Sequence, residues 1–224
     1  MPLRFKKKKR PLYVSSEANL QNERNVMIPF SSYDDFIETA RNFHGCASPG
    51  LMIGAAMVEL ALHSMGRIRQ YHALSETPRD LPDAIQLLTA CTVGNGRLHI
   101  LDLGHFAMTL YRHPEGRGVR VYLDIVKTAG WPHIRRWALG ENISDEKELV
   151  RLEHEIRKAG ITILSASPVQ LKDLFPDALK SQTMTTCICC GELHPAATGA
   201  LCRSCAGQSP YIPRLPAVTR YEQA

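Results

Sequence analysis

The sequence predicts an α+β protein in which a largely antiparallel sheet packs against helices, followed by a small C-terminal zinc-finger domain with four cysteine ligands. Segments with helical periodicity come first, a run of strand candidates follows, and two CxxC pairs lie near the end of the chain. Helices segregated from consecutive strands are typical of α+β folds. We therefore expect a basic arm and linker over residues 1–30, a core over 31–180, and a zinc-finger module with its tail over 181–224.

Two helices are predicted at the start of the core. The first begins in the serine and aspartate run of 31–35 and ends near Phe43, because serine favours the N-cap and acidic residues favour the first turn. The second begins at Ser48 and Pro49, which suit the N-cap and the first helical position, and continues through 51–64. This helix is apolar on almost every side, so we expect it at the centre of the core.

The middle of the chain is predicted to form a helix and three strands. The helix is expected at 83–89, and a glycine-rich turn follows it at 94–96. Strands are expected at 98–103, 105–112 and 118–126, where β-favouring and apolar residues lie between turn residues.

The remainder of the core is predicted to return to mixed structure. A charged amphipathic helix is expected at 144–158, a short strand at 161–164 and a short helix at 168–174. The aromatic and basic residues of 131–137 suit either an edge of the core or a dimer interface, or a surface that stacks on a ligand.

Charge is concentrated at the N-terminus. Residues 1–10 contain six basic residues and no acid, whereas the rest of the chain carries 21 basic and 22 acidic residues. The arm suits binding to nucleic acid or to an anionic surface, and a solvated extension without a partner is the alternative. No secretory signal follows the arm, and no apolar run approaches the roughly 18 residues of a membrane span, so we expect a cytoplasmic protein.

Four cysteines in two CxxC pairs predict a structural zinc site. The pairs are separated by eleven residues, and together they offer the tetrahedral thiolate set that zinc prefers. Disulfides are the alternative, which a reducing compartment disfavours. Cys189 interrupts the first pair as a bystander or a shifted ligand, and His194 is expected to be exposed to solvent. The predicted zinc ligands are Cys187, Cys190, Cys202 and Cys205.

A second metal site is suggested by three residues of the core. His44 and Cys46 lie two residues apart at a helix junction, and Cys91 lies in a turn after the next predicted helix. Nitrogen and sulfur ligands together suit a transition metal, although an isolated buried cysteine is more often a small apolar residue. The sequence leaves the element open.

The motifs around these residues resemble a known family. They are FHGCASPG at 43–50, DAIQLLTACTVGNG at 83–96, DLGHFAMT from Asp102, and the two CxxC pairs. In this order they resemble the FmdE family, which is named after formylmethanofuran dehydrogenase, over residues 36–205. The resemblance implies an α+β core, a treble-clef zinc finger, a homodimer, and a core metal centre that includes His44 and Cys91. It also matches Asp83, Gln86 and Asp102 to polar positions of the family motifs.

The sequence departs from the family motifs at positions close to the implied centre. Cys46 stands where the family has a second histidine, Ser48 stands where it has cysteine, and His105 stands where it has lysine. The core set is therefore either His44, Cys46 and Cys91, or His44 and Cys91 alone. Asp102 is expected either to orient a metal ligand or to hold a turn.

Three functions follow from these features. The first is a homodimeric metal-binding accessory protein, related to molybdenum or tungsten formylmethanofuran dehydrogenase systems. Its core site holds or transfers a metal or binds a cofactor that carries one, and its zinc finger stabilises the fold or docks on a metalloenzyme or another protein partner. The second is an enzyme with an open position on the core metal, where His105 or Asp102 handles protons. The third is a regulator that binds nucleic acid through the basic arm and the zinc finger.

Overall fold

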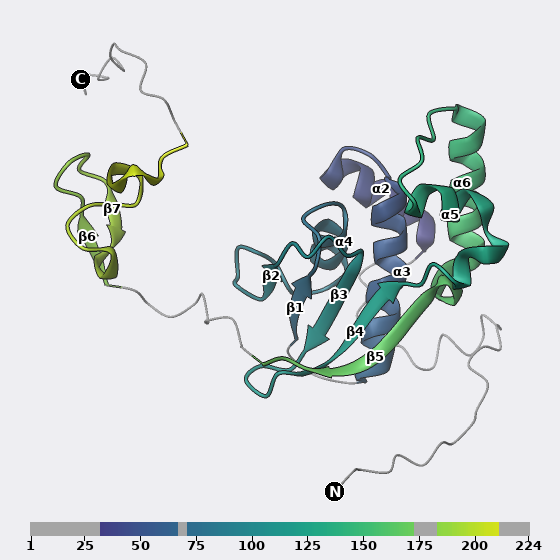
Figure 1. The fold of residues 1–224 in the computed structure, drawn as a ribbon, viewed down its shortest axis with the longest axis horizontal. Coiled ribbons are helices and arrows are strands. Elements are labelled where there is room, and N and C mark those ends of the chain that lie inside the picture. Colours follow the sequence, from purple (N-terminus) through teal and green to yellow (C-terminus); the bar gives the residue numbers. More distant parts are fainter. Residues whose placement is uncertain (1–31, 67–70, 173–182, 211–224) are drawn as a thin grey trace, which may run out of the picture. The chain divides into compact units, whose positions relative to one another are not determined.

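The computed structural model describes residues 32–66, 71–172 and 183–210 (Figure 1). The chain forms two compact units, Met1–Ala178 and Leu179–Ala224. The basic arm, and with it the predicted contact with nucleic acid, lies outside the described residues.

A five-stranded sheet forms the frame of the core (Figure 1). Its order is β2-β1-β3-β4-β5, and every neighbouring pair is antiparallel except β1 and β2. The prediction of a largely antiparallel α+β fold is therefore confirmed. The strands are β1 (His72–Ser75), β2 (Leu98–Ile100), β3 (Ala107–Tyr111), β4 (Arg117–Leu123) and β5 (Leu164–Gln170).

The parallel pair of strands was not expected from the sequence. Strand β1 has four residues, too few to show a clear alternation of apolar and polar side chains. Helix α4 (Leu81–Leu88) then connects it to β2, as the crossover that a parallel pair requires. The helix begins two residues earlier than predicted, and Pro82 lies in its first turn, where the missing N–H costs nothing.

The two N-terminal helices are as predicted. Helix α2 (Tyr33–His44) begins where Ser32 Oγ accepts a hydrogen bond from the Asp35 amide at 3.1 Å. Helix α3 (Pro49–Met65) has Ser48 in the same role, and it contributes nine buried residues to the core beside the sheet. Even α3 is too short to cross a bilayer, and no helix in the described ranges is long and apolar enough to do so.

The second half of the core differs from the prediction in three places. Helix α6 (Glu146–Ala159) is close to the expected range, but α5 (Pro132–Ala138) was not predicted as a helix. The expected strand at 161–164 is mostly a 3-10 turn, η2 (Gly160–Ile163), and another such turn, η1 (Lys127–Gly130), precedes α5.

The expected helix at 168–174 is wrong, because Pro168 lies inside strand β5. Proline cannot donate to a sheet ladder, but β5 is an edge strand, where one side needs no partner. In the 131–137 segment, Trp137 packs edge-on against Phe106 with ring centroids 5.5 Å apart. This contact supports the interpretation that the aromatic residues cover an edge of the core.

The C-terminal unit contains a two-stranded antiparallel sheet and short turns. Strands β6 (Met184–Thr186) and β7 (Leu193–Pro195) pair directly. The short helical turns η3 (Ala196–Thr198) and η4 (Ser204–Gln208) follow them.

We expect Gly118→Ala to destabilise the core by about 2–3 kcal/mol, through overpacking of the sheet. Gly118 is paired with Tyr111 across β4 and β3, and a Cβ placed there would collide with the Leu110 carbonyl oxygen and lie 2.7 Å from Tyr111 Cβ. Urea unfolding followed by circular dichroism measures the cost. Gly130→Ala is the matched control, since a Cβ there meets no heavy atom within 4 Å. Equal stability of the two variants would contradict the prediction.

Candidate metal sites and a buried charge network

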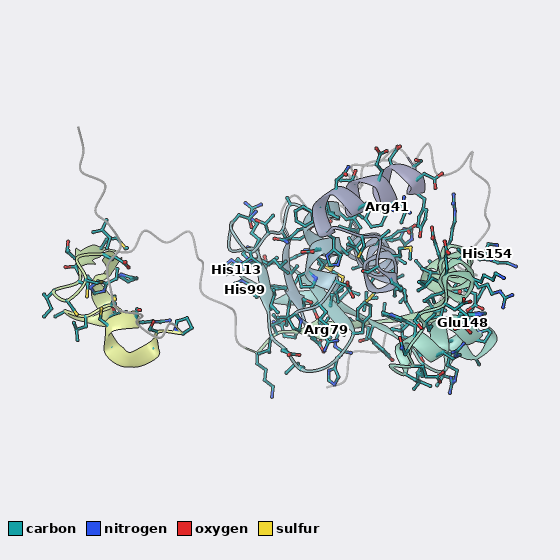
Figure 2. All side chains as sticks on the ribbon, turned by 90° about the horizontal axis from the view of Figure 1, so that it is seen from above. Arg41, Arg79, His99, His113, Glu148 and His154 are labelled. Atoms are coloured by element: carbon teal, nitrogen blue, oxygen red, sulfur yellow. The ribbon has the colours of Figure 1, made fainter. Side chains whose placement is uncertain are left out.

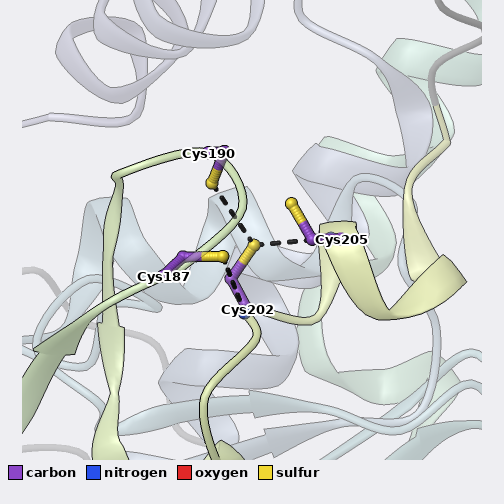
Figure 3. Close-up of side chains that lie close together, drawn as sticks. All are labelled: Cys187, Cys190, Cys202 and Cys205. Atoms are coloured by element: carbon purple, nitrogen blue, oxygen red, sulfur yellow. Dashed lines mark hydrogen bonds between the residues drawn. The ribbon is translucent and has the colours of Figure 1, made fainter.

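The four predicted zinc ligands converge in the C-terminal unit (Figure 3). Their sulfur atoms all lie within 4.8 Å of one another, and those of Cys190 and Cys202 are 3.8 Å apart. Sulfurs bound about 2.3 Å from one tetrahedral zinc ion are separated by about 3.8 Å, so the arrangement fits a closed site with four thiolate ligands. None of the seven cysteines forms a disulfide, which removes the alternative interpretation of the CxxC pairs.

Backbone amides point at the sulfurs of this cluster. The Cys202 amide donates to Cys187 Sγ, and the Cys205 amide donates to Cys202 Sγ, both at 3.4 Å. Hydrogen bonds from the Cys190 and Cys202 backbones lower the pKa of Cys187 to about 6, whereas the neighbouring thiols, Cys202 first, raise the pKa of Cys205. Four thiolates this close repel one another, so a bound cation is what allows all of them to ionise together.

The residues around the cluster follow the expected geometry with one exception. Gly191 has a φ of +79°, a conformation that glycine adopts without strain, and Cys189 is exposed. His194 was expected to face solvent, but it is only 5% exposed. Its Nδ1 lies 2.7 Å from Thr198 Oγ1, so the side chain serves the packing of the module.

In the core, His44 lies between two aspartates. Its Nδ1 is 2.6 Å from Asp83 Oδ2, and its Nε2 is 3.2 Å from Asp80 Oδ1. Gln86 supports Asp83 with a hydrogen bond of 3.3 Å to Oδ1, and its own Oε1 accepts from the Val93 amide. The DAIQ motif therefore fixes the ring of His44 from one side of helix α4.

Asp80 is held in an unusual conformation beside His44. Its φ is +53°, a region that non-glycine residues rarely adopt and that is often retained at functional sites. Ser48 donates its hydroxyl to Asp80 Oδ1 at 2.7 Å, and a Cβ at Gly50 would lie 2.8 Å from the Asp80 carboxyl carbon. The turn before α4 and the start of α3 thus meet closely at this carboxylate.

The structure does not gather the three predicted core ligands into one cluster. Cys46 is exposed at the junction of α2 and α3, near His44 in sequence. Cys91 is buried, its thiol donates to the Tyr71 carbonyl at 3.2 Å, and burial raises its pKa. Helix α4 explains the separation, since Asp83 belongs to its first turn and Cys91 follows its last. Eight helical residues span about 12 Å.

Residues 43–173 match the family model described as FmdE, Molybdenum formylmethanofuran dehydrogenase operon. The matched segment is more than half of the 224-residue chain. The chain belongs to the FmdE family. Residues 180–212 match the FmdE treble clef zinc finger, so the C-terminal CxxC pairs belong to that module. The resemblance inferred from the sequence motifs is confirmed.

Two relatives extend the comparison for this FmdE-family chain. A solved structure, that of a tungsten formylmethanofuran dehydrogenase FmdE-like protein from Syntrophus aciditrophicus, is 43% identical, with a TM-score of 0.75 over 83% of this chain and 97% of that one. A curated protein of Archaeoglobus fulgidus, named a probable S-adenosyl-L-methionine-binding protein, is 27% identical over 199 residues. The match covers 80% of this chain, which spans 54% of that relative's length.

The FmdE-family core also contains a histidine group that the sequence did not bring together. The rings of His72 and His113 stack with centroids 4.6 Å apart, and the ring centroid of His99 lies 6.4 Å from that of His72. His99 and His113 are labelled in Figure 2. Burial and the nearby His113 lower the pKa of His99. Tyr111 packs against His72 with ring centroids 5.7 Å apart, and burial, with the nearby Cys91 as a secondary cause, raises the pKa of Tyr111 to about 12. Cys91 therefore belongs to the surroundings of this group rather than to those of His44.

A third polar group joins three separate elements of the core. Glu76, immediately after β1, lies 2.6 Å from Arg120 Nε on β4 and 2.9 Å from His105 Nδ1 in the loop before β3. The Glu76 side chain is 5% exposed, so this is a buried carboxylate. Asp102 is exposed, and its Oδ1 accepts from the Gly104 amide at 3.0 Å, which identifies it as a turn residue.

Proposed function

We propose that this FmdE-family protein handles a metal, with zinc fixed in the C-terminal module and a second metal, or a cofactor that carries one, bound beside His44 in the core. The observation that supports the core site is the pair of contacts on the His44 ring, to Asp83 through Nδ1 and to Asp80 through Nε2. A histidine that binds a metal usually donates its other ring N–H to a carboxylate, which fixes the ring and raises its basicity.

Two donor atoms beside His44 have the spacing expected for ligands of one first-row transition metal ion. Ligand atoms about 2.1 Å from one ion lie roughly 3–3.5 Å apart, and Nε2 of His44 is 3.2 Å from Asp80 Oδ1. Asp83 and Gln86 would then orient the histidine, while Cys46 lies two residues away as an exposed thiol. A structural ion pair without metal is the competing account, and metal content separates the two.

The wider role that we propose is that of an accessory protein for a molybdenum or tungsten enzyme. The description of the matched family and the name of the Syntrophus protein support this role. We further propose that the protein acts in the cytoplasm, where cysteines stay reduced, and as a homodimer. The archaeal relative suggests S-adenosyl-L-methionine instead, but almost half of that protein lies outside the match, so its ligand is weaker support.

We expect about two metal ions per chain in anaerobically purified protein, and about one in His44→Ala. Elemental analysis per chain measures both the number and the element. Cys91→Ala is expected to retain both metals, because its thiol is committed to the Tyr71 carbonyl beyond the far end of α4.

The other variants test whether the second metal binds beside His44. Gly50→Ala, which pushes on Asp80 without removing a donor, should weaken the core metal and leave the zinc in place. One zinc per chain in wild type, unchanged in His44→Ala, would contradict the core site. A loss in Cys91→Ala but not in His44→Ala would place the centre at the other end of α4.

A further inference from the structure

His105 is presented to solvent by a buried carboxylate. Its side chain is 61% exposed, whereas Glu76, which contacts its Nδ1 at 2.9 Å, is 5% exposed. Arg120 donates two hydrogen bonds to the same carboxylate, from Nε to Oε1 at 2.6 Å and from Nη2 to Oε2 at 2.7 Å. The contacts therefore connect Arg120 on β4, through the buried Glu76, to the exposed imidazole of His105.

The chemistry of these contacts fixes which ring nitrogen is available. Hydrogen bonds from Arg120, and secondarily from His105, lower the pKa of Glu76, so the carboxylate is ionised and can only accept. His105 Nδ1 must therefore carry the ring proton and donate a hydrogen bond to Glu76. In the neutral ring the lone pair is then on Nε2. Because Arg120 already balances the charge of Glu76, His105 is not needed as its counter-ion.

A second histidine–glutamate pair in the same core shows what a purely structural pair looks like. His133 Nδ1 lies 2.7 Å from Glu155 Oε1, but the Glu155 side chain also accepts hydrogen bonds from the backbone amides of His133 and Ile134. That carboxylate stabilises the start of α5, and the His133 side chain is only 18% exposed. The Glu76 carboxylate accepts no backbone amide in the described hydrogen bonds and supports an exposed ring instead.

We propose that His105 is an acid–base group of this protein, positioned by Glu76 and Arg120, and that its partner is a small molecule with a weakly acidic O–H or N–H. Nε2 accepts the proton of that group and becomes N–H, while the electron pair of the broken bond stays on the ligand. The proton returns to the ligand or passes to solvent. Carboxylate-supported imidazoles suit this role near neutral pH.

The position of the pair places it near the proposed core site without depending on it. Glu76 and Asp80 belong to the same connection between β1 and α4, so their Cα atoms are at most about 14 Å apart. The acid–base role of His105 stands whether or not a metal binds beside His44. Its charged neighbours are Glu76 and Arg120, and Asp102 lies three residues before it in the loop.

Diethylpyrocarbonate tests the nucleophilic character of Nε2 in the full-length protein. The Nε2 lone pair forms a bond to a carbonyl carbon as the C–O bond to ethyl carbonate breaks, and the Nδ1 proton passes to Glu76 or solvent. Peptide mass spectrometry gives the acylation rate of each histidine at a pH where imidazoles are neutral. We expect His105 to react about threefold or more faster than His154, an exposed histidine on α6 (Figure 2).

The variants and a spectroscopic measurement make the result decisive. Glu76→Gln should reduce the rate at His105 to that of His154, because an amide can also donate to Nδ1 and shift the lone pair away from Nε2. ¹⁵N NMR of the wild-type ring should show the Nδ1–H tautomer. A wild-type rate at His105 no higher than at His154, or an Nε2–H tautomer, would overturn the proposal, and neither requires that the variant folds.

Discussion

Cys202→Ala is expected to unfold the C-terminal zinc-finger module while the core keeps its helices and sheet. Over its described residues, 183–210, the module has almost no apolar interior. Met184, Ile188 and Leu193 are 50%, 78% and 70% exposed, whereas Cys187 and Cys202 are buried. A unit this small that cannot bury apolar side chains depends on its metal, and structural zinc supplies about 10 kcal/mol or more of folding free energy at neutral pH.

Loss of zinc and loss of structure should coincide in this module. Amide NMR signals from β6 and β7 should collapse in Cys202→Ala, and in wild type after a strong chelator is added, while signals from the core strands persist. Cys189→Ala is the matched control, because this exposed cysteine lies between two ligands but outside the cluster. A folded module in Cys202→Ala, or an unfolded one in Cys189→Ala, would show that the ligands are assigned wrongly.

The features that the sequence predicted well depend on neighbouring residues. The four clustered cysteines come from two short turns, so their spacing alone predicts that they meet. The starts of α2 and α3 depend on serine side chains that bond amides three residues ahead. Such contacts can be predicted from a short window of sequence, because the first amides of a helix have no partner within the helix and a nearby side chain must accept from them.

The features that the sequence did not predict depend on contacts between residues far apart in the chain. Glu76 follows a four-residue strand, and its partners lie 29 and 44 residues away in sequence. No local pattern marks it or Asp80, whose positive φ appears only in the structure. The family motifs group Cys91 with His44, and the sequence predicts a helix before Cys91, but it does not show that His44 contacts the opposite end of that helix through Asp83.

Arg120→Met is expected to destabilise the core by about 3 kcal/mol at pH 7. Glu76 is 5% exposed, and removal of Arg120 leaves its charge supported by His105 alone. Breaking one half of a buried ion pair costs about 3–5 kcal/mol, and the 29% exposure of Arg120 places the cost at the lower end. Urea unfolding of the variant against wild type measures it. Arg136→Met removes an arginine that pairs with Glu141 and Glu148 at the surface, and it should cost clearly less than Arg120→Met.

The pH dependence separates a buried charge pair from simple loss of packing. Arg120 lowers the pKa of Glu76 in the folded state, so this carboxylate contributes stability above its unfolded pKa of about 4.3, and that contribution is lost as the pH falls through the folded value. In Arg120→Met, burial of the unpaired carboxylate favours the protonated form of Glu76. Lowering the pH therefore removes the cost of the buried charge. The cost of the substitution should therefore shrink between pH 7 and pH 4. It should also shrink when Glu76→Gln is combined with Arg120→Met, because no unpaired charge then remains in the core. A cost that is the same at both pH values and in both backgrounds would mean that Arg120 stabilises the sheet through its aliphatic stem alone.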